Sequence, residues 1–217
     1  MNSSEIVELF RQTVSDEAVP YLWSDAEAYR YLDDAQKMFC RLTGGLGDGS
    51  TTVTQLSYTD ASDWVTLSPL ILKIRAATDN ATGRHIDVLN FEDMRADDRA
   101  FSATKAGTVR AVVIGIEPGR ARLSPYPRVA GQINLIVDRL PLKSITDADQ
   151  KLEIAEQHHQ HLITWMLYRA YSKQDAETLN RKAAQDAELA FNQYCFDAEA
   201  EKARAMHKTR TVRYGGI

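Results

Sequence analysis

Cysteine is scarce in this sequence, which contains only Cys40 and Cys195 among its 217 residues. The two lie far apart in the chain, each within a helical pattern of apolar residues. Two such residues do not make the disulfide framework that stabilises small secreted domains. We therefore interpret both as small buried hydrophobic side chains, in a protein suited to a reducing compartment.

Long hydrophobic runs are lacking as well. No stretch approaches the roughly 20 apolar residues of a membrane-spanning helix, and the first residues lack the charged and apolar regions of a secretory signal peptide. We therefore expect a protein that is made and used outside membranes. With 44% hydrophobic and 26% charged residues, the composition is ordinary for a globular protein with one domain, or one domain with an insertion.

Positive charge is not in excess, because the formal net charge is −4. A general nucleic-acid binder is usually clearly basic, so this balance argues against that class. The charge is nonetheless uneven. After Glu201 the chain contains no acid and five basic residues: Lys202, Arg204, Lys208, Arg210 and Arg213. A basic tail of this kind typically contacts an acidic surface or phosphate.

Motifs for catalysis are also missing. The glycine-rich stretch GGLGDGS (44–50) lacks the Lys-Ser/Thr of a phosphate loop and follows no strand, so we interpret it as a flexible linker. There is no Gly-x-Ser-x-Gly and no His-Glu-x-x-His. The adjacent aspartates at 33–34 and 97–98 would diverge in a helix or a strand, and we interpret both pairs as solvated surface. We therefore expect no enzymatic activity and no cofactor.

Histidine is concentrated at one place, where His158, His159 and His161 occur within four residues. Glu156 and His159 match the Glu-x-x-His pair of di-iron helical bundles. That site needs a second such pair and two further carboxylates, and the sequence contains no second pair. A metal-dependent enzyme is therefore the weakest alternative, and a surface or helix-packing role is the preferred interpretation.

Helical periodicity marks the first part of the chain. Residues 3–14 carry apolar side chains at helical spacing, with Ser3 or Ser4 available as the cap. Ser24 and Glu27 form a capping box at the start of a second helix. Its apolar stripe consists of Ala28, Leu32, Ala35, Phe39 and Leu42. Gly44 and Gly45 then end the helix.

The last quarter of the chain predicts two more helices. Asp147 and Gln150 resemble a capping box, and the helix that they open is expected to end near Ser172. The next helix, from about 175 to 206, has a stripe of mostly small residues: Leu179, Ala183, Ala187, Ala190, Tyr194 and Ala198. Small side chains bury little area. We therefore expect this helix to need contacts from outside its own bundle.

Between residues 51 and 140 the apolar period changes from 3.6 to 2. Alternation over 70–76, a turn at 79–83 and renewed alternation over 86–88 predict a hairpin. Strands are also expected over 109–116 and 132–140, with a turn at Glu117-Pro118-Gly119-Arg120, whereas 92–108 predicts a short strand and an exposed loop. Short strands with frequent turns and no helix between them are typical of an antiparallel sheet or small sandwich.

This order of helices, strands and helices predicts an α+β fold, in which an antiparallel β block is inserted into a helical bundle. We divide the chain into N-terminal helices (1–49), the β block (50–146), a C-terminal helix pair (147–206) and an extended basic docking tail (207–217). The tail has two interpretations beside that of an end without a role. It could bind nucleic-acid phosphate, with a salt-dependent affinity, or become ordered on a protein partner. Tyr214 and Ile217 favour the second, because apolar anchors fit pockets.

Three stretches resemble the head-to-tail adaptor proteins of short-tailed and related bacteriophages, also called head–tail connector or head-completion proteins. They are PYLWSDAEAYRYLDDAQKMFCRL (20–42), the region IGIEPGRARLSPYPRVAGQINLIVDRLPL (114–142) and HHQHLITWMLYRAYSKQDAETLNRKAAQDAELAFNQY (158–194). The main motifs are Trp-Ser-Asp-x-Glu, the Glu-Pro-Gly turn followed by Leu and Pro-x-Pro, and the Leu-Tyr-Arg-Ala-Tyr-x-Lys-x-Asp corner. The resemblance covers most of the chain, although 44–62 and 92–108 match nothing in it.

The resemblance implies a virion structural protein at the head–tail junction, assembled in the cytoplasm of the bacterial host. Such adaptors form a ring, expected to be a dodecamer, beneath the portal protein. Genomic DNA passes through the lumen without sequence-specific binding, and a tail or nozzle protein attaches below. An acidic overall charge would suit a channel in which DNA slides. The alternative function is a nucleic-acid-binding phage accessory protein that uses the basic tail.

By the same resemblance, the C-terminal tail reaches into clefts of the portal ring. The candidate portal contacts are Lys208, Arg210, Arg213, Tyr214 and Ile217. The helix pair 147–206 would make ring contacts, with Trp165, Tyr168, Leu179 and Tyr194 as candidates, and the β block would face the tail. Because the long helix and the tail look incomplete alone, we expect the free protein to be largely monomeric.

Overall fold

The computed structural model describes residues 1–94, 106–175 and 178–206, and it has the α+β composition expected from the sequence. The chain divides into two compact units. The helical unit consists of Met1–Thr43 and Lys143–Ile217, and the β unit consists of Gly44–Leu142. The four-part division by role, with its docking tail, stays a prediction.

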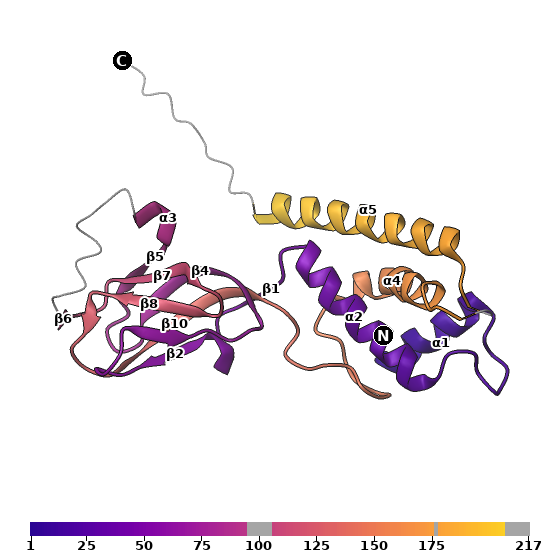
Figure 1. Ribbon diagram of the computed structural model, residues 1–217, viewed down its shortest axis with the longest axis horizontal. Helices are drawn as coiled ribbons and strands as arrows, with labels where there is room; N and C mark the ends of the chain where they lie inside the picture. Colours follow the sequence, from indigo (N-terminus) through magenta and orange to yellow (C-terminus); the bar gives the residue numbers. More distant parts are fainter. Residues whose placement is uncertain (95–105, 176–177, 207–217) are drawn as a thin grey trace, which may run out of the picture. The chain divides into compact units, whose positions relative to one another are not determined.

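The helical unit contains α1 (Ser3–Val14), α2 (Asp25–Leu42), α4 (His159–Tyr171) and α5 (Arg181–Met206), with a short 3-10 turn, η2 (Glu156–His158), before α4. Helix α4 packs against α1, α2 and α5, and α5 lies alongside it (Figure 1). The buried side chains of α4 are His159, Leu162, Ile163, Trp165, Met166 and Ala170. They point to several sides of the helix, so α4 is covered over much of its surface.

The first two helices begin and end with local signals. Ser24 and Glu27 form the predicted capping box of α2, and Gly44 and Gly45 follow the helix with positive φ angles. Four residues of the predicted stripe are buried, whereas Leu42, at the end of the helix, is 38% exposed. The cap of α1 is neither Ser3 nor Ser4 but Asn2, whose side chain accepts a hydrogen bond from the Glu5 amide.

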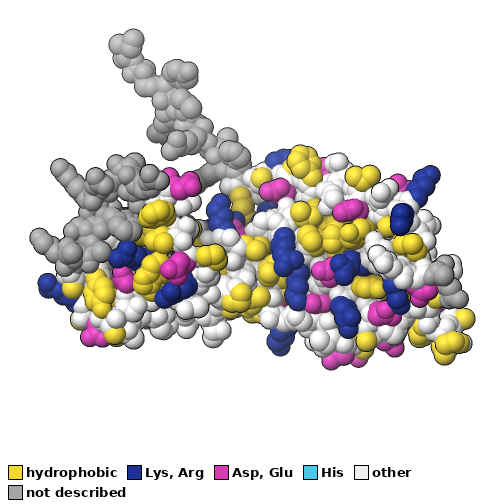
Figure 2. Space-filling view, in the orientation of Figure 1, with side chains coloured by type: hydrophobic (Ala, Val, Ile, Leu, Met, Phe, Trp, Pro, Cys, Tyr) yellow, Lys and Arg dark blue, Asp and Glu magenta, His cyan; other side chains and the backbone are white. Residues whose placement is uncertain are grey.

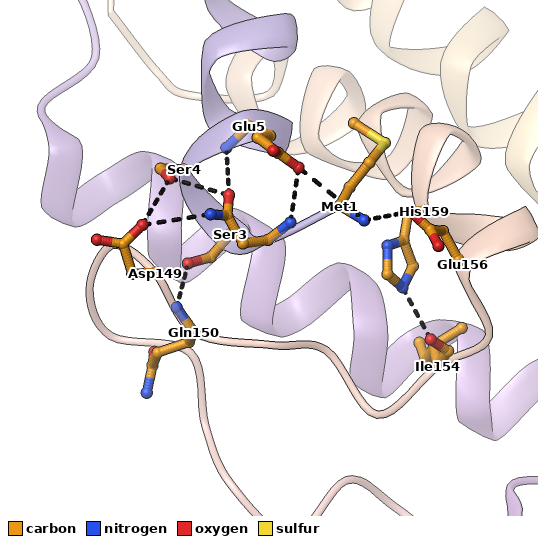
Figure 3. A network of polar contacts seen from close by, with 10 residues as sticks. Met1, Ser3, Ser4, Glu5, Asp149, Gln150, Ile154, Glu156 and His159 are labelled. Atoms are coloured by element: carbon orange, nitrogen blue, oxygen red, sulfur yellow. Dashed lines mark hydrogen bonds and ion pairs between the residues drawn. The ribbon is translucent and has the colours of Figure 1, made fainter.

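The two C-terminal helices begin later than the sequence predicts. Residues 147–155 are not helical, and α4 begins at His159. Their backbone binds the start of α1 instead, because the Ser3 amide donates to the Gln150 carbonyl and the Ser3 hydroxyl donates to the Asp147 carbonyl. The Gln150 amide in turn donates to the Ser3 hydroxyl (Figure 3). Helix α5 begins at Arg181, where the Asn180 side chain accepts a hydrogen bond from the Ala183 amide.

The β unit is built on one curled sheet. Its strands are β1 (Leu46–Asp48), β2 (Gln55–Tyr58), β3 (Trp64–Thr66), β4 (Ile71–Asp79), β5 (His85–Asn90), β7 (Ala111–Glu117), β8 (Arg120–Ser124) and β10 (Gly131–Arg139). They lie in the order β1-β10-β4-β5-β7-β8-β3, and β2 also pairs with β10. The sheet curls so that β3 and β2, near its two ends, come into contact. Short elements complete the unit: η1 (Thr52–Thr54), α3 (Phe91–Met94), and the pair β6 (Ala106–Gly107) and β9 (Tyr126–Pro127).

Several predicted strands are confirmed. Strands β4 and β5 form the expected hairpin, and β7 and β8 meet at the Glu117-to-Arg120 turn. Ile133, Leu135 and Val137 of β10 are fully buried on one face, as their alternation indicates. The core of the unit also contains Leu56, Val65, Ile74, Ala77, Ile86, Val112 and Leu123.

Two expectations for the β unit are wrong, the first about strand direction and the second about residues 44–50. The β block is not purely antiparallel, because β5 pairs with β7 in parallel, as β6 does with β9. The chain between β5 and β7 is long enough to return and run in the same direction, which a tight turn cannot do. Only part of this connection is described: of the segment 92–108, for which a short strand and an exposed loop are predicted, residues 95–105 lie outside the described residues.

The stretch 44–50 is not a flexible linker. Residues 46–48 pair with Arg139–Val137 of β10. Asp48 is buried and forms an ion pair with the equally buried Arg139. Burial alone would raise the pKa of Asp48, but hydrogen bonds from the Ser50 amide, the Thr51 hydroxyl and Arg139 hold that pKa well below its ordinary value. Because Leu46 pairs with Arg139, the β unit begins and ends at neighbouring points of one sheet.

Candidate assembly surfaces of the helical unit

The three histidines around 158–161 are packing residues of the helical unit. The His158 Nδ1 and the Tyr194 hydroxyl are joined by a hydrogen bond of 2.7 Å, and His161 stacks on the Tyr194 ring with centroids 3.5 Å apart. His159 is buried, with its Nε2 in a hydrogen bond to the Ile154 carbonyl (Figure 3). Burial is the main cause that lowers the pKa of His158 below its ordinary value. The preferred interpretation of this motif as helix packing is therefore confirmed for His158 and His159.

The cysteines are also internal. Cys40 of α2 and Cys195 of α5 are both buried, and neither forms a disulfide. Burial, with a smaller contribution from neighbouring Cys40, raises the pKa of the Cys195 thiol to about 12. A thiol with so high a pKa is almost entirely protonated at neutral pH and is a poor nucleophile. Both residues thus act as the small buried hydrophobes expected from the sequence.

Helix α5 has one buried face, and it differs from the predicted stripe. Its buried residues are Ala184, Ala187, Phe191, Cys195 and Ala198. Of the predicted stripe, Leu179 precedes the helix and is 43% exposed, and Ala190 is exposed. Four of the five observed positions are small or carry a thiol, and Phe191, which is fully buried, packs on Trp165 with ring centroids 5.1 Å apart. One large side chain therefore anchors the long helix.

The opposite face of α5 exposes large apolar side chains. Leu189 and Phe196 are 68% and 67% exposed. They are seven residues apart, which is close to two helical turns, so they lie one above the other on the same face. Hydrophobic side chains reach the surface over this helix (Figure 2). We call these two residues, together with the exposed acids Asp186 and Asp197 beside them, the α5 ridge.

A second surface feature lies at the corner between α4 and α5. It is a hollow of about 670 Å³, lined by Tyr168 and Tyr171 of α4, by Leu179 of the link and by Arg181 and Ala184 of α5. Its volume lies in the range of pockets that hold small ligands or protruding side chains. We call it the corner hollow. Tyr, Trp and Arg are the residue types most enriched at the energetic centres of protein interfaces.

The four predicted ring contacts lie in different environments in the structure. Trp165 is buried, and its indole Nε1 donates a hydrogen bond of 2.8 Å to Asp34 Oδ2, so it belongs to the core of its own unit. Tyr168 and Tyr194 are partly buried, the first against Trp165 and the second between the two histidines. Leu179 is exposed and lines the corner hollow. A role in ring contacts stays a prediction for all four.

Sequence reasoning missed the α5 ridge. The stripe of small residues predicts the inner, packed face of the helix, and Leu189 and Phe196 are not part of that stripe. Their spacing of seven residues, which places both on one helix face away from the stripe of small residues, was the available signal. The predicted portal contacts Lys208, Arg210, Arg213, Tyr214 and Ile217 all lie outside the described residues.

Among the described side chains, no group of three or more His, Cys, Asp or Glu is arranged to hold a metal ion. None of the described helices is both long and apolar enough to cross a membrane.

A comparison with protein families identifies a match over nearly the whole chain. The family model described as SU10 adaptor protein matches residues 1–213. The match therefore covers the β unit and all four long helices of the helical unit, and it extends into the basic tail. No curated protein is similar to the chain at a significant level.

Proposed function

Because the chain belongs to the SU10 adaptor protein family, we propose that it is the ring-forming adaptor between the portal and the tail of a bacteriophage. The family supports the coarser description, a structural adaptor protein that is a component of the phage virion. The finer proposal is that copies of the chain close into a dodecameric ring that surrounds the DNA channel. It includes the portal above and a tail or nozzle protein below as partners.

The observation that carries this proposal is the extent of the match. It spans residues 1–213 rather than one shared element, so both units belong to the family pattern. The exposed apolar side chains of α5 support it further. Leu189 and Phe196 would be covered in an assembly, and large exposed apolar side chains in a row are typical of interaction sites.

Within the ring, genomic DNA would pass without sequence-specific binding. The formal charge of the chain is −4 although residues 202–213 carry five basic side chains and no acid, so the rest of the chain is clearly acidic. Acidic surfaces repel the phosphate backbone and would let DNA slide. The protein would assemble in the cytoplasm of the host and remain at the head–tail junction of the virion.

Electron microscopy of the chain mixed with the portal protein of the same phage tests the proposal. We expect a ring of adaptor density stacked on one end of the portal, with the rotational symmetry of a dodecamer. A chain that stays monomeric and does not bind the portal at saturating concentration would contradict the proposed function. Binding of the chain to DNA with a steep salt dependence, in place of the portal, would favour the accessory-protein alternative.

A further inference from the structure

We propose that the α5 ridge of one copy docks into the corner hollow of a second copy, so that each chain contributes one ridge and one hollow. This inference deepens the proposed function, since it names the surfaces through which copies in the ring would meet. A contact between two different surfaces is heterologous, and repeating it around an axis closes a ring. The ridge and the hollow match in shape and in charge, and the same charges disfavour a symmetric contact between two ridges.

Shape supports the pairing because the two features complement each other. The ridge projects two large apolar side chains, Leu189 and Phe196, from a helix whose other exposed residues before its last, Met206, are small or polar. The hollow offers the aromatic faces of Tyr168 and Tyr171 and the exposed side chain of Leu179. Seating an apolar side chain in such a lined hollow removes both surfaces from water, which stabilises the contact by roughly 25 cal/mol per Å² of apolar area.

Charge supports the pairing of the ridge with the hollow as well. From Ala183 to Glu201 the chain carries no Lys or Arg and five acids: Asp186, Glu188, Asp197, Glu199 and Glu201. At the corner, Arg169 and Lys173 form ion pairs with Asp34 and Glu27 of α2, and Asp175 lines the hollow beside Arg181. The charges that the corner offers to the acidic ridge of a second copy are therefore those of the exposed Arg181 and Lys182, and complementary potentials of this kind also orient the encounter.

The start of α5 adds a separate observation. Arg181 and Lys182 occupy its first turn, which contains no acid. The amino end of a helix carries a partial positive charge, so two basic residues there disfavour the helix by up to about 1 kcal/mol each. Both side chains are exposed. Their position does not stabilise the helix, but it suits the approach of carboxylates such as Asp186 and Asp197 from a neighbouring copy.

A symmetric contact between two ridges is disfavoured by the same charges. In an antiparallel pair of α5 helices with Leu189 against Phe196, Asp186 would face Glu199 and Glu188 would face Asp197. Arg181 would face Arg204 in the same pair. Like charges that face each other across an interface repel. The helix therefore discourages a closed two-fold dimer and leaves its ridge available for a different surface.

Two variants, each at an exposed position, test the pairing in the full-length chain. Phe196→Glu removes the ridge and Leu179→Glu blocks the hollow. Sedimentation velocity of the concentrated wild-type chain should show reversible self-association. Each variant should weaken it by about thirtyfold, the factor for an interface residue worth about 2 kcal/mol. An equimolar mixture of the two variants should form pairs and nothing larger. The intact ridge of the Leu179→Glu variant can dock into the intact hollow of the Phe196→Glu variant, and the other ridge and hollow of that pair are both altered.

Val129→Glu is the matched control, because it also replaces an exposed apolar side chain by glutamate, at a 73% exposed position in the β unit that belongs to neither the ridge nor the hollow. It should associate like the wild type. Circular dichroism checks that each variant is folded, and Phe196→Gln and Leu179→Gln replace any variant that is not. The inference is wrong if the wild-type chain stays monomeric up to millimolar concentration, if either variant associates normally, or if the mixture forms no pairs. Portal binding by the wild type tests the proposed function separately, so the two can fail independently.

Discussion

At the scale of single residues, the buried pair of Asp48 and Arg139 is a contact on which the stability of the β unit depends. Both side chains are more than 90% buried, and Asp48 also accepts hydrogen bonds from the Ser50 amide and the Thr51 hydroxyl. A buried ion pair is costly to form, but it is still more costly to break, because the remaining charge is left without a partner. This pair joins β1 to β10 near the point where the β unit begins and ends.

The first prediction is that Asp48→Asn destabilises the β unit by about 3–5 kcal/mol. The control is Glu117→Gln, which breaks the exposed pair of Glu117 and Arg120 in the same unit and should cost at most about 1 kcal/mol. Urea unfolding measures both, and hydrogen exchange of β1 and β10 locates the effect. Equal costs for the two variants would show that the buried pair does not hold β1 on the sheet.

The second prediction concerns pH. Because the pKa of Asp48 is lowered in the folded chain, its contribution to the free energy of unfolding is complete above its ordinary value of 3.8 and is lost as the pH falls below it. Wild-type stability should therefore decline steeply below about pH 4. Asp48→Asn should decline less over the same window. Parallel pH profiles of the urea midpoint in the two proteins would refute this assignment.

At the scale of elements, helix α5 carries two phenylalanines with opposite roles. Phe191 is fully buried against Trp165, whereas Phe196 is 67% exposed on the ridge. They differ by five residues, which rotates the side chain by about 140° around the helix. We therefore expect Phe191 to contribute to the stability of the helical unit and Phe196 to the association of copies.

The third prediction uses this pair. Phe191→Ala should lower the free energy of unfolding by about 3–5 kcal/mol, because it leaves a cavity in the core of the helical unit. Phe196→Ala should change it by less than about 0.5 kcal/mol, because an exposed position away from special contacts tolerates substitution. Thermal or urea unfolding of the monomer measures both. A large loss in Phe196→Ala would mean that the ridge packs within its own chain.

The beginning of α4 shows that a capping motif in the sequence does not always start a helix. Ser24 and Glu27 open α2 as expected, but Asp147 and Gln150 open no helix. The Gln150 side chain accepts hydrogen bonds from the amides of Thr146 and Asp147 within a loop, and the loop backbone pairs with Ser3. The same residue types can therefore satisfy a helix or a loop, and the partner from the other end of the chain decides which.

At the scale of the whole molecule, an insertion into a helical unit requires that its two ends lie close together. The β unit meets this requirement within its own sheet, where Leu46 pairs with Arg139. Gly45 precedes this pair with a φ of +83° and lies so close to the Arg139 backbone that a Cβ atom would be 3.0 Å from its carbonyl oxygen. Glycine therefore suits this junction for both its conformation and its size.

The fourth prediction concerns the tail. Removing residues 207–217 should abolish portal binding, because the truncation removes Tyr214, Ile217 and three basic residues that would dock into the portal. It should leave the melting temperature nearly unchanged, since each unit has a hydrophobic core among the residues that the structure describes, all of which precede residue 207. Electron microscopy with the portal and thermal unfolding measure the two effects. Normal portal binding by the truncated chain would disprove the docking role of the tail.

The sequence by itself determined the main helices and the longer strands, because the apolar period and the turn residues are local properties. The stripe of α2, the hairpins and the inner face of β10 follow from it. Only the tertiary structure decided the start of α4, the buried face of α5, the parallel pairing of β5 with β7 and the strand at 46–48. Each of these depends on a partner far away in the sequence, such as Ser3 for the loop at 147–155 and Arg139 for Asp48. A local pattern cannot specify a contact whose other half is a hundred residues distant.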